Sequence, residues 1–268
     1  MSTLRVTAVQ FAPGESAVAN LDAMAPFVQE AAEAGSEMVV FPEYSHAFTS
    51  TLGDQGAASA ESAEGEFVRG LTALSTGHGG MVIVAGMLLR SLGDERPANT
   101  QVAVGPEGIL ARAEKIHLYD AFGATESTWI RPGALSEPEL FSCGGLRIGM
   151  MACYDLRFPE HYRALVDAGA EILLAPSAFT ATTGAAHWAV LVRARAIENL
   201  CYMLAPDQGG LHANQRHTHG ESLIVDPWGE CLAGCPVGGG PGIAVADLDR
   251  AHQAELRQRL PALAHRQR

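Results

Sequence analysis

Arg147-Ile-Gly-Met-Met-Ala-Cys-Tyr-Asp-Leu-Arg-Phe-Pro-Glu160 is the stretch that decides the fold, because it places a cysteine where a buried strand turns into a helix. Residues 148–152 are small or apolar, as expected of a strand covered on both faces. Pro159 and Glu160 suit a first helical turn, and the pattern predicts a helix over 161–168. Backbone N–H groups and the helix dipole at this junction favour a thiolate. Cys153 is therefore a candidate nucleophile, although such a cysteine is most often core filler.

Composition predicts an ordinary globular protein. The 268 residues are 47% hydrophobic and 18% charged, with a formal net charge of −12 and no basic cluster. This balance excludes a nucleic-acid partner and an anionic membrane surface. We find no signal peptide and no apolar run of membrane-spanning length, so we expect a cytoplasmic protein that forms one domain over 1–268. The five cysteines lack paired metal spacing, which indicates free thiols.

Strands and helices alternate along the whole chain, which predicts an α/β fold. Gly105-Pro-Glu-Gly108 is a strong turn signal and predicts a hairpin between 99–104 and 108–113. Further segments are predicted from periodicity and from Gly and Pro stops. They are helices over 20–34, 65–75, 188–200 and 249–259, strands over 37–41, 81–89, 138–141, 146–152, 171–176, 201–205, 221–225, 230–234 and 243–247, and loops over 121–136 and 177–188.

Three chemically useful side chains follow predicted strands. Glu43 comes directly after the strand 37–41, and Lys115 ends the second strand of the hairpin. Cys153 ends a third strand, so all three could meet on one side of a sheet, where open α/β folds place functional groups. The loop over 121–136 is long for a compact domain and carries Glu126.

The sequence gives weaker support to a serine nucleophile, a histidine base or a metal site than to Glu43, Lys115 and Cys153. No Gly-x-Ser-x-Gly elbow is present, and a histidine base for Cys153 would have to be His117, His161 or His187. His217 and His219 could reach a metal, with His212 and Glu221 nearby, but the spacing matches no established zinc motif. The spacing of these residues therefore predicts no metal site.

Three ordered segments carry a family resemblance: Phe41-Pro-Glu43, Glu114-Lys115-Ile-His-Leu-Tyr-Asp, and Cys153-Tyr-Asp-Leu-Arg-Phe-Pro-Glu. They resemble the signature segments of the nitrilase, or carbon–nitrogen hydrolase, superfamily. The resemblance covers nearly the whole chain and continues through Ile224-Val-Asp-Pro-Trp-Gly229. It implies a four-layer αββα sandwich that pairs into a homodimer or a higher homo-oligomer. It also implies covalent catalysis without a cofactor.

The resemblance assigns roles residue by residue. Glu43 matches the general base, Lys115 the lysine that stabilises the tetrahedral intermediate, and Cys153 the nucleophile. Glu126, in Thr125-Glu-Ser127, matches the glutamate that positions the lysine and the substrate. The backbone N–H of Tyr154 would help Lys115 to hold the oxyanion. The expected reaction is hydrolysis of a small amide through a thioester acyl-enzyme.

The substrate expectation comes from one branch of the family. The segments 153–157 and 179–188 are most similar to the omega-amidase and deaminated-glutathione amidase branch, which hydrolyses the distal amide of α-keto dicarboxylic monoamides. By that similarity Tyr154, Arg157, Phe179 and Thr183 line the pocket, with Arg157 facing a substrate carboxylate. An ion pair of Arg157 with Asp155 or Glu160 is an equally good interpretation.

The substrate alternatives stay open at this point. The connection between Lys115 and Glu126 is shorter than expected in that branch, and it borders the expected pocket. An N-carbamoyl hydrolase or a nitrilase would use the same fold. A non-catalytic scaffold is the alternative from another class, but it would have no need of all four residues Glu43, Lys115, Glu126 and Cys153.

Overall fold

A computed structural model describes residues 3–48, 58–90, 93–212 and 217–267. Within these residues the strands form two six-stranded sheets and one two-stranded ribbon. The first sheet has the order β14-β1-β2-β3-β4-β5, and its strands are β1 (Thr3–Gln10), β2 (Met38–Val40), β3 (Val82–Leu89), β4 (Ala98–Gly105), β5 (Gly108–Glu114) and β14 (Gly242–Asp249). The second has the order β13-β12-β9-β8-β7-β6, with β6 (Leu140–Cys143), β7 (Leu146–Met150), β8 (Ile172–Leu174), β9 (Tyr202–Ala205), β12 (Leu223–Val225) and β13 (Cys231–Gly234).

Both sheets are parallel at the centre and antiparallel at the edges. In the first sheet β1, β2 and β3 run parallel, and in the second β7, β8 and β9 do. The central strands are buried on both faces, which explains why their sequences are continuous apolar runs. The helices are α1 (Ala17–Glu33), α3 (Glu66–Gly77), α4 (Pro159–Asp167), α5 (Ala181–Asn199) and α6 (Arg250–Arg259), with 3₁₀ segments η1 (Glu126–Thr128) and η2 (Cys153–Arg157).

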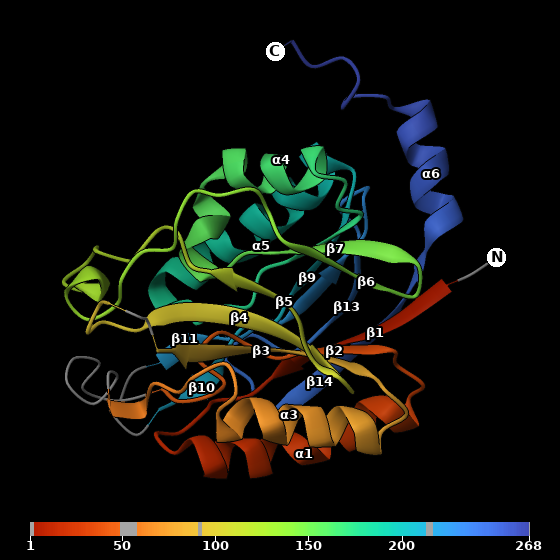
Figure 1. Ribbon diagram of the computed structural model, residues 1–268. Helices are drawn as coiled ribbons and strands as arrows, with labels where there is room; N and C mark the ends of the chain where they lie inside the picture. Colours follow the sequence, from red (N-terminus) through yellow and green to blue (C-terminus); the bar gives the residue numbers. More distant parts are fainter. Residues whose placement is uncertain (1–2, 49–57, 91–92, 213–216, 268) are drawn as a thin grey trace.

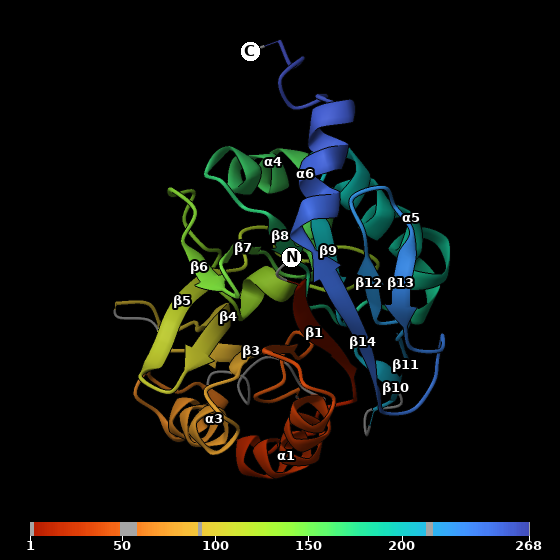
Figure 2. The same cartoon turned by 90° about the vertical axis from the view of Figure 1, so that its right-hand side faces the viewer.

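The elements stack as helix, sheet, sheet and helix (Figure 1). One buried cluster, with Val84 and Ile148, lies between the two sheets. A second joins α1 and α3 to the outer face of the first sheet, and a third joins α4 and α5 to the second sheet. Figure 2 shows the same layers from the side, with α6 projecting beyond the sandwich toward the C-terminus. The expected αββα architecture is confirmed.

Most predicted elements are present with shifted ends, and the hairpin is β4 and β5 with Gly105 opposite Gly108. The helix expected over 188–200 was placed too late. It begins at Ala181, because the Thr180 side chain caps it by accepting from the Thr183 N–H. The pairing of β10 (Gly209–Leu211) with β11 (His217–His219) was not predicted. None of the helices in the described part of the chain is both long and apolar enough to cross a membrane.

The turn after β2 lies against β3 at a glycine. An added Cβ at Gly86 would lie 2.6 Å from the Tyr44 backbone nitrogen and 2.9 Å from the Glu43 Cα. The Gly86 carbonyl accepts the His46 N–H at 2.8 Å. The absence of a side chain at Gly86 therefore allows the segment that carries Glu43 to lie directly on the sheet.

Replacing Gly86 by alanine is expected to destabilise the fold by about 1–3 kcal/mol, because backbone atoms of Glu43 and Tyr44 would have to shift. Urea unfolding measures this change. The matched control is Gly77→Ala at the end of α3, where an added Cβ meets no atom within 4 Å. Equal stabilities of the two variants would show that the close approach at Gly86 is unimportant.

Candidate active site

Lys115 joins the two glutamates that the sequence singled out. Its Nζ lies 2.9 Å from Glu43 Oε1, and 3.0 and 2.9 Å from Glu126 Oε1 and Oε2. The three side chains are almost inaccessible to solvent, with 2%, 1% and 7% of their surface exposed for Lys115, Glu43 and Glu126. The strand ends after β2 and β5 and the segment η1 supply them.

Further donors complete this buried group. The Tyr44 hydroxyl donates to Glu126 Oε1 at 2.5 Å, and the Tyr119 N–H donates to Oε2 at 2.6 Å. The Asn99 side-chain amide donates to Glu43 Oε1 at 2.7 Å. Two buried carboxylates beside one lysine carry an excess negative charge, and these neutral donors stabilise it.

Cys153 lies at the start of η2 in a strained backbone conformation. Its φ is +45°, in the left-handed region that non-glycine residues rarely adopt. The Cys153 N–H donates to the Pro176 carbonyl at 3.0 Å, and the Ala178 N–H lies close enough to the sulfur to lower the pKa of the thiol. The Glu43 carboxyl lies close enough to the thiol to raise its pKa. This turn therefore presents the sulfur to Glu43.

The expectation of a thiolate at Cys153 was wrong. Burial raises the pKa of the Cys153 thiol well above its usual value, Glu43 raises it further, and Lys115 lowers it less. The segment that begins at Cys153 is a short 3₁₀ helix, and α4 begins only at Pro159. The resting form at neutral pH is thus a thiol, which needs a base before it can attack.

The environments of the two glutamates push their pKa values apart. For Glu43, burial raises the pKa most, Lys115 lowers it and Glu126 raises it, so that it lies above the ordinary value. For Glu126, burial also opposes ionisation, but Lys115, Tyr44 and the Tyr119 N–H outweigh it and lower the pKa. This difference suits Glu43 to exchange a proton while Glu126 stays ionised.

Another buried carboxylate, Asp155, connects the segment after Lys115 to the turn that holds Cys153. Its Oδ1 accepts the His117 N–H at 2.9 Å and lies 2.8 Å from His117 Nδ1. Its Oδ2 accepts the Ala152 N–H at 3.4 Å. His117 is thus bound to Asp155 and stacks on Phe158 with ring centroids 3.5 Å apart.

The histidine alternatives are not brought to the sulfur. His161 packs against His117, and His187 lies 3.4 Å from the Arg157 guanidinium. The group Glu43, Lys115 and Cys153 is therefore the arrangement that the geometry favours. Across residues 3–48, 58–90, 93–212 and 217–267 no cluster of His, Cys, Asp or Glu could hold a metal ion. His219 is instead bound to Glu221 at 2.9 Å.

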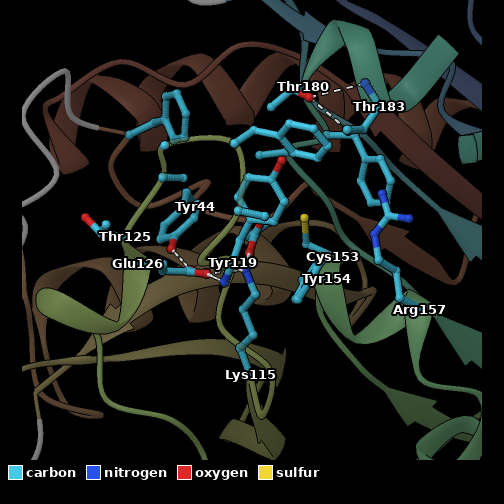
Figure 3. A pocket seen from close by; sticks show the side chains of 18 of the residues that line it. Tyr44, Lys115, Tyr119, Thr125, Glu126, Cys153, Tyr154, Arg157, Thr180 and Thr183 are labelled. Carbon is cyan, nitrogen blue, oxygen red and sulfur yellow. Dashed lines mark hydrogen bonds and ion pairs between the residues drawn. The ribbon is translucent and has the colours of Figure 1, made fainter. Parts of the chain in front are cut away.

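A pocket of about 690 Å³ opens beside these groups. Figure 3 shows Lys115 and Glu126 together on one side, the Cys153 sulfur near the middle, and Arg157 on the other side. All eight site residues that the sequence suggested line it, namely Glu43, Lys115, Glu126, Cys153, Tyr154, Arg157, Phe179 and Thr183. The loop between Lys115 and Glu126 forms its rim, where Phe122 is 90% exposed.

Arg157 is a cation held against aromatic rings. Its guanidinium lies 5.7 Å from the ring centre of Tyr154 and 5.6 Å from that of Phe179. The ion pair considered from the sequence does not form: within the described ranges, neither Asp155 nor Glu160 pairs with Arg157. A guanidinium in this position can bind a carboxylate through two parallel hydrogen bonds.

Comparison with known proteins agrees with the geometry. A family model described as carbon-nitrogen hydrolase matches residues 5–258. The chain belongs to the carbon–nitrogen hydrolase family. A deaminated glutathione amidase of Synechocystis sp. is 45% identical over 174 residues. That match covers 63% of this chain and 63% of the relative, less than two thirds of its length.

Solved structures of other proteins share the fold. The NitFhit protein of C. elegans superposes with a TM-score of 0.91 at 29% identity, covering 100% of this chain and 66% of that one. A mutant amidase from Nesterenkonia sp. AN1 superposes with a TM-score of 0.78 at 26% identity, covering 97% and 99% of the two chains. That structure shows the result of Michael addition of acrylamide at the active-site cysteine.

Several residues of this carbon–nitrogen hydrolase site were missed from the sequence. Tyr44 and Asn99 contact the glutamates, and Gln208 donates to the Glu43 carbonyl at 2.7 Å. Asn99 lies on a strand whose residues are all buried. A polar side chain on a buried strand indicates a functional role, and this signal was available from the sequence. Tyr44 and Gln208 have no comparable local signal.

Glu126→Gln is expected to lower the free energy of unfolding by about 3 kcal/mol at pH 7, because Lys115 loses a buried charge partner. The pKa of Glu126 is lowered in the folded protein, so its ionisation stabilises the fold at pH values above 4.5, the ordinary pKa of this carboxyl group. This stabilisation is lost as the pH falls through the folded value, so the difference from wild type should shrink below about pH 4.5. Urea unfolding at several pH values measures it.

Glu255→Gln is the matched control, since Glu255 is exposed and its ion pair with Arg259 lies at the surface. We expect it to unfold like wild type at every pH. If the free energies of unfolding of Glu126→Gln and wild type differ by the same amount down to pH 3, the lowered pKa of Glu126 is contradicted.

Proposed function

We propose that this protein is a cofactor-independent cysteine amidase that hydrolyses small carboxylated amides through a thioester on Cys153. The observation that carries the proposal is that one pocket contains a buried thiol, a carboxylate that can act as its base, and a lysine. The same pocket contains the guanidinium of Arg157, which can bind a substrate carboxylate. Family membership and the amidase relatives support this reaction class.

The first half-reaction begins with proton transfer from the Cys153 thiol to Glu43, whose carboxyl lies close enough to the thiol to raise its pKa. The sulfur then attacks the amide carbon, and Lys115 and the Tyr154 N–H stabilise the oxyanion. Glu43 gives its proton to the departing nitrogen as the C–N bond breaks. The products are an acyl thioester on Cys153 and a free amine or ammonia.

In the second half-reaction Glu43 acts as the base toward water, and Cys153 is the leaving group. Ionised Glu43 takes a proton from a water molecule, which attacks the thioester carbonyl. The carboxylic acid product leaves, and the proton on Glu43 returns to the Cys153 sulfur. Throughout, Glu126 keeps Lys115 charged: burial alone would lower the pKa of Lys115, but Glu126 and Glu43 raise it well above its usual value.

The proposed substrates are α-keto dicarboxylic monoamides such as α-ketoglutaramate or deaminated glutathione. Arg157 supports a negatively charged substrate, because this guanidinium lines the pocket and contacts His187 and two aromatic rings. Phe179 and Thr183 line the pocket with it. The Synechocystis relative that is named a deaminated glutathione amidase supports the same substrate class.

Both substrates contain the same α-ketoglutaryl group, so they should leave the same acyl mass on Cys153. The measurement is intact mass spectrometry after brief mixing, with an assay of released ammonia or amine. Cys153→Ala should show neither adduct nor turnover. An N-carbamoyl amine is included, because release of carbon dioxide would instead identify a carbamoyl hydrolase. Turnover by Cys153→Ala, or wild-type protein inert toward every amide, would overturn the proposal.

Arg157→Gln should reduce kcat/KM for α-ketoglutaramate by about 10- to 100-fold, since a charge-assisted hydrogen bond contributes about 1.5–3 kcal/mol. The loss should appear mainly in KM and be much smaller for a neutral amide such as propionamide. Arg69→Gln is the control, because Arg69 lies on α3 and bonds to the Glu64 carbonyl outside the pocket. Equal losses for charged and neutral amides would show that Arg157 does not bind the carboxylate.

A further inference from the structure

Asn99 occupies a special position between the two glutamates. Its amide nitrogen lies 2.7 Å from Glu43 Oε1 and 3.5 Å from Glu126 Oε1. Its backbone carbonyl accepts the Lys115 N–H at 2.7 Å. Asn99, on β4, therefore lies next to Lys115, which follows β5. Asn99 is fully buried. It is thus a neutral donor inside a charged group.

The hydrogen bonds of the two glutamates are distributed unequally. Glu126 accepts bonds on both oxygens: from Lys115 on each, from Tyr44 and, at 3.5 Å, from Asn99 on Oε1, and from the Tyr119 N–H on Oε2. Glu43 accepts the Lys115 and Asn99 bonds on the same oxygen, Oε1. Both bonds therefore leave Oε2 of Glu43 for the thiol and, later, for the leaving nitrogen and water.

We propose that Asn99 is a positioning residue that anchors Oε1 of Glu43 and leaves Oε2 to exchange protons with Cys153. Lys115 alone cannot fix the carboxylate, because its ammonium group also bonds both oxygens of Glu126. The Asn99 amide is a second, uncharged anchor on the side of β4. This inference rests on the proposed function, in which Glu43 is the base.

In the part of the chain that the structure describes, the orientation of the Asn99 amide leaves its own oxygen without a partner, which argues against a merely structural role. Within the described residues, Oδ1 of Asn99 is buried and has no hydrogen-bond partner. Turning the amide over would place that oxygen against two carboxylates, so the orientation with the nitrogen toward them is the favourable one. An apolar residue of the same size would leave no unpaired acceptor on β4. The unpaired oxygen is therefore accepted for the sake of the bond to Glu43.

The charged and titratable groups that face Glu43 come from several elements. They are Tyr44 beside it, Lys115 after β5, Glu126 in η1, Cys153 in η2 and Asp207 after β9. Of these only Lys115 is positive, and the thiol is neutral at rest. Removing the Asn99 donor should make the Glu43 anion less stable, and an aspartate there would add repulsion.

Alkylation of Cys153 by iodoacetamide tests the inference without knowledge of the substrate. The sulfur forms a bond to the CH₂ carbon, iodide leaves, and the thiol proton passes to Glu43 and then to solvent. The rate is measured from pH 5 to 9 by mass spectrometry for wild type, Asn99→Leu and Asn99→Asp. Thermal unfolding of each variant shows whether it is folded at the assay temperature.

We expect Asn99→Leu to react at least tenfold more slowly than wild type at pH 7. Its rate should recover at higher pH, because Glu43 holds its proton to a higher pH. Asn99→Asp should shift the profile further than Asn99→Leu, by at least one pH unit from wild type. A loss of structure alone would give neither this order nor recovery at high pH.

Gln101→Met is the matched control. Gln101 is a buried amide two residues along β4 on the same face as Asn99, and its amide has no hydrogen-bond partner in the described part of the chain. It should react like wild type. Folded Asn99 variants whose profiles coincide with wild type would overturn the inference, even if wild type hydrolyses an amide. Shifted profiles in a protein that hydrolyses no amide would leave the inference intact and reject the proposed function.

Discussion

The contact of one buried lysine with two buried glutamates is the constraint on which the rest of the site depends. Each charge loses several kcal/mol of hydration when it is buried, and only close, well-oriented partners offset that cost. Lys115 lies within 3.0 Å of three carboxylate oxygens, and Tyr44 and Tyr119 complete the bonding of Glu126. Because small displacements would leave a buried charge without a partner, the chain segments that carry these groups must be held firmly.

The fold holds them through backbone contacts rather than through the charges themselves. Gly86 allows the segment after β2 to lie on β3, and Gln208 donates to the Glu43 carbonyl. Asp155 joins the backbone after Lys115 to the backbone before Cys153. The site thus consists of side chains that follow β2, β5 and β7, together with Glu126 in η1, and hydrogen bonds to backbone groups tie these segments together.

Sequence patterns predicted the parts of this arrangement that depend on local order. Apolar runs ended by Pro42 or by the Cys153 turn indicated strand ends, and Glu43, Lys115 and Cys153 do converge. The sandwich itself came from the family resemblance, since periodicity alone gave only an α/β fold. The start of α5 was misjudged because Thr180 caps a segment whose Thr and Gly residues read as loop.

The missed features depend on contacts between segments far apart in the chain. The Tyr44 bond to Glu126 spans 82 positions, and the Asn99 bond to Glu43 spans 56. The protonation of Cys153 was misjudged for the same reason. The helix dipole and the nearness of Glu43 could be inferred from the sequence, but the depth of burial, which raises the pKa of the thiol most, could not.

A resting thiol gives the proposed mechanism a simple electrostatic property. When the Cys153 proton moves to Glu43, the negative charge passes from the carboxylate to the sulfur, and the total charge of the buried group does not change. In a medium of low dielectric constant, moving a charge between partners of one lysine costs far less than creating one. Glu126 has to remain ionised for this exchange, and its bonds from Lys115, Tyr44 and Tyr119 keep its pKa low. The unequal hydrogen bonding of the two glutamates is therefore what allows one of them to act as base while the other keeps the lysine charged.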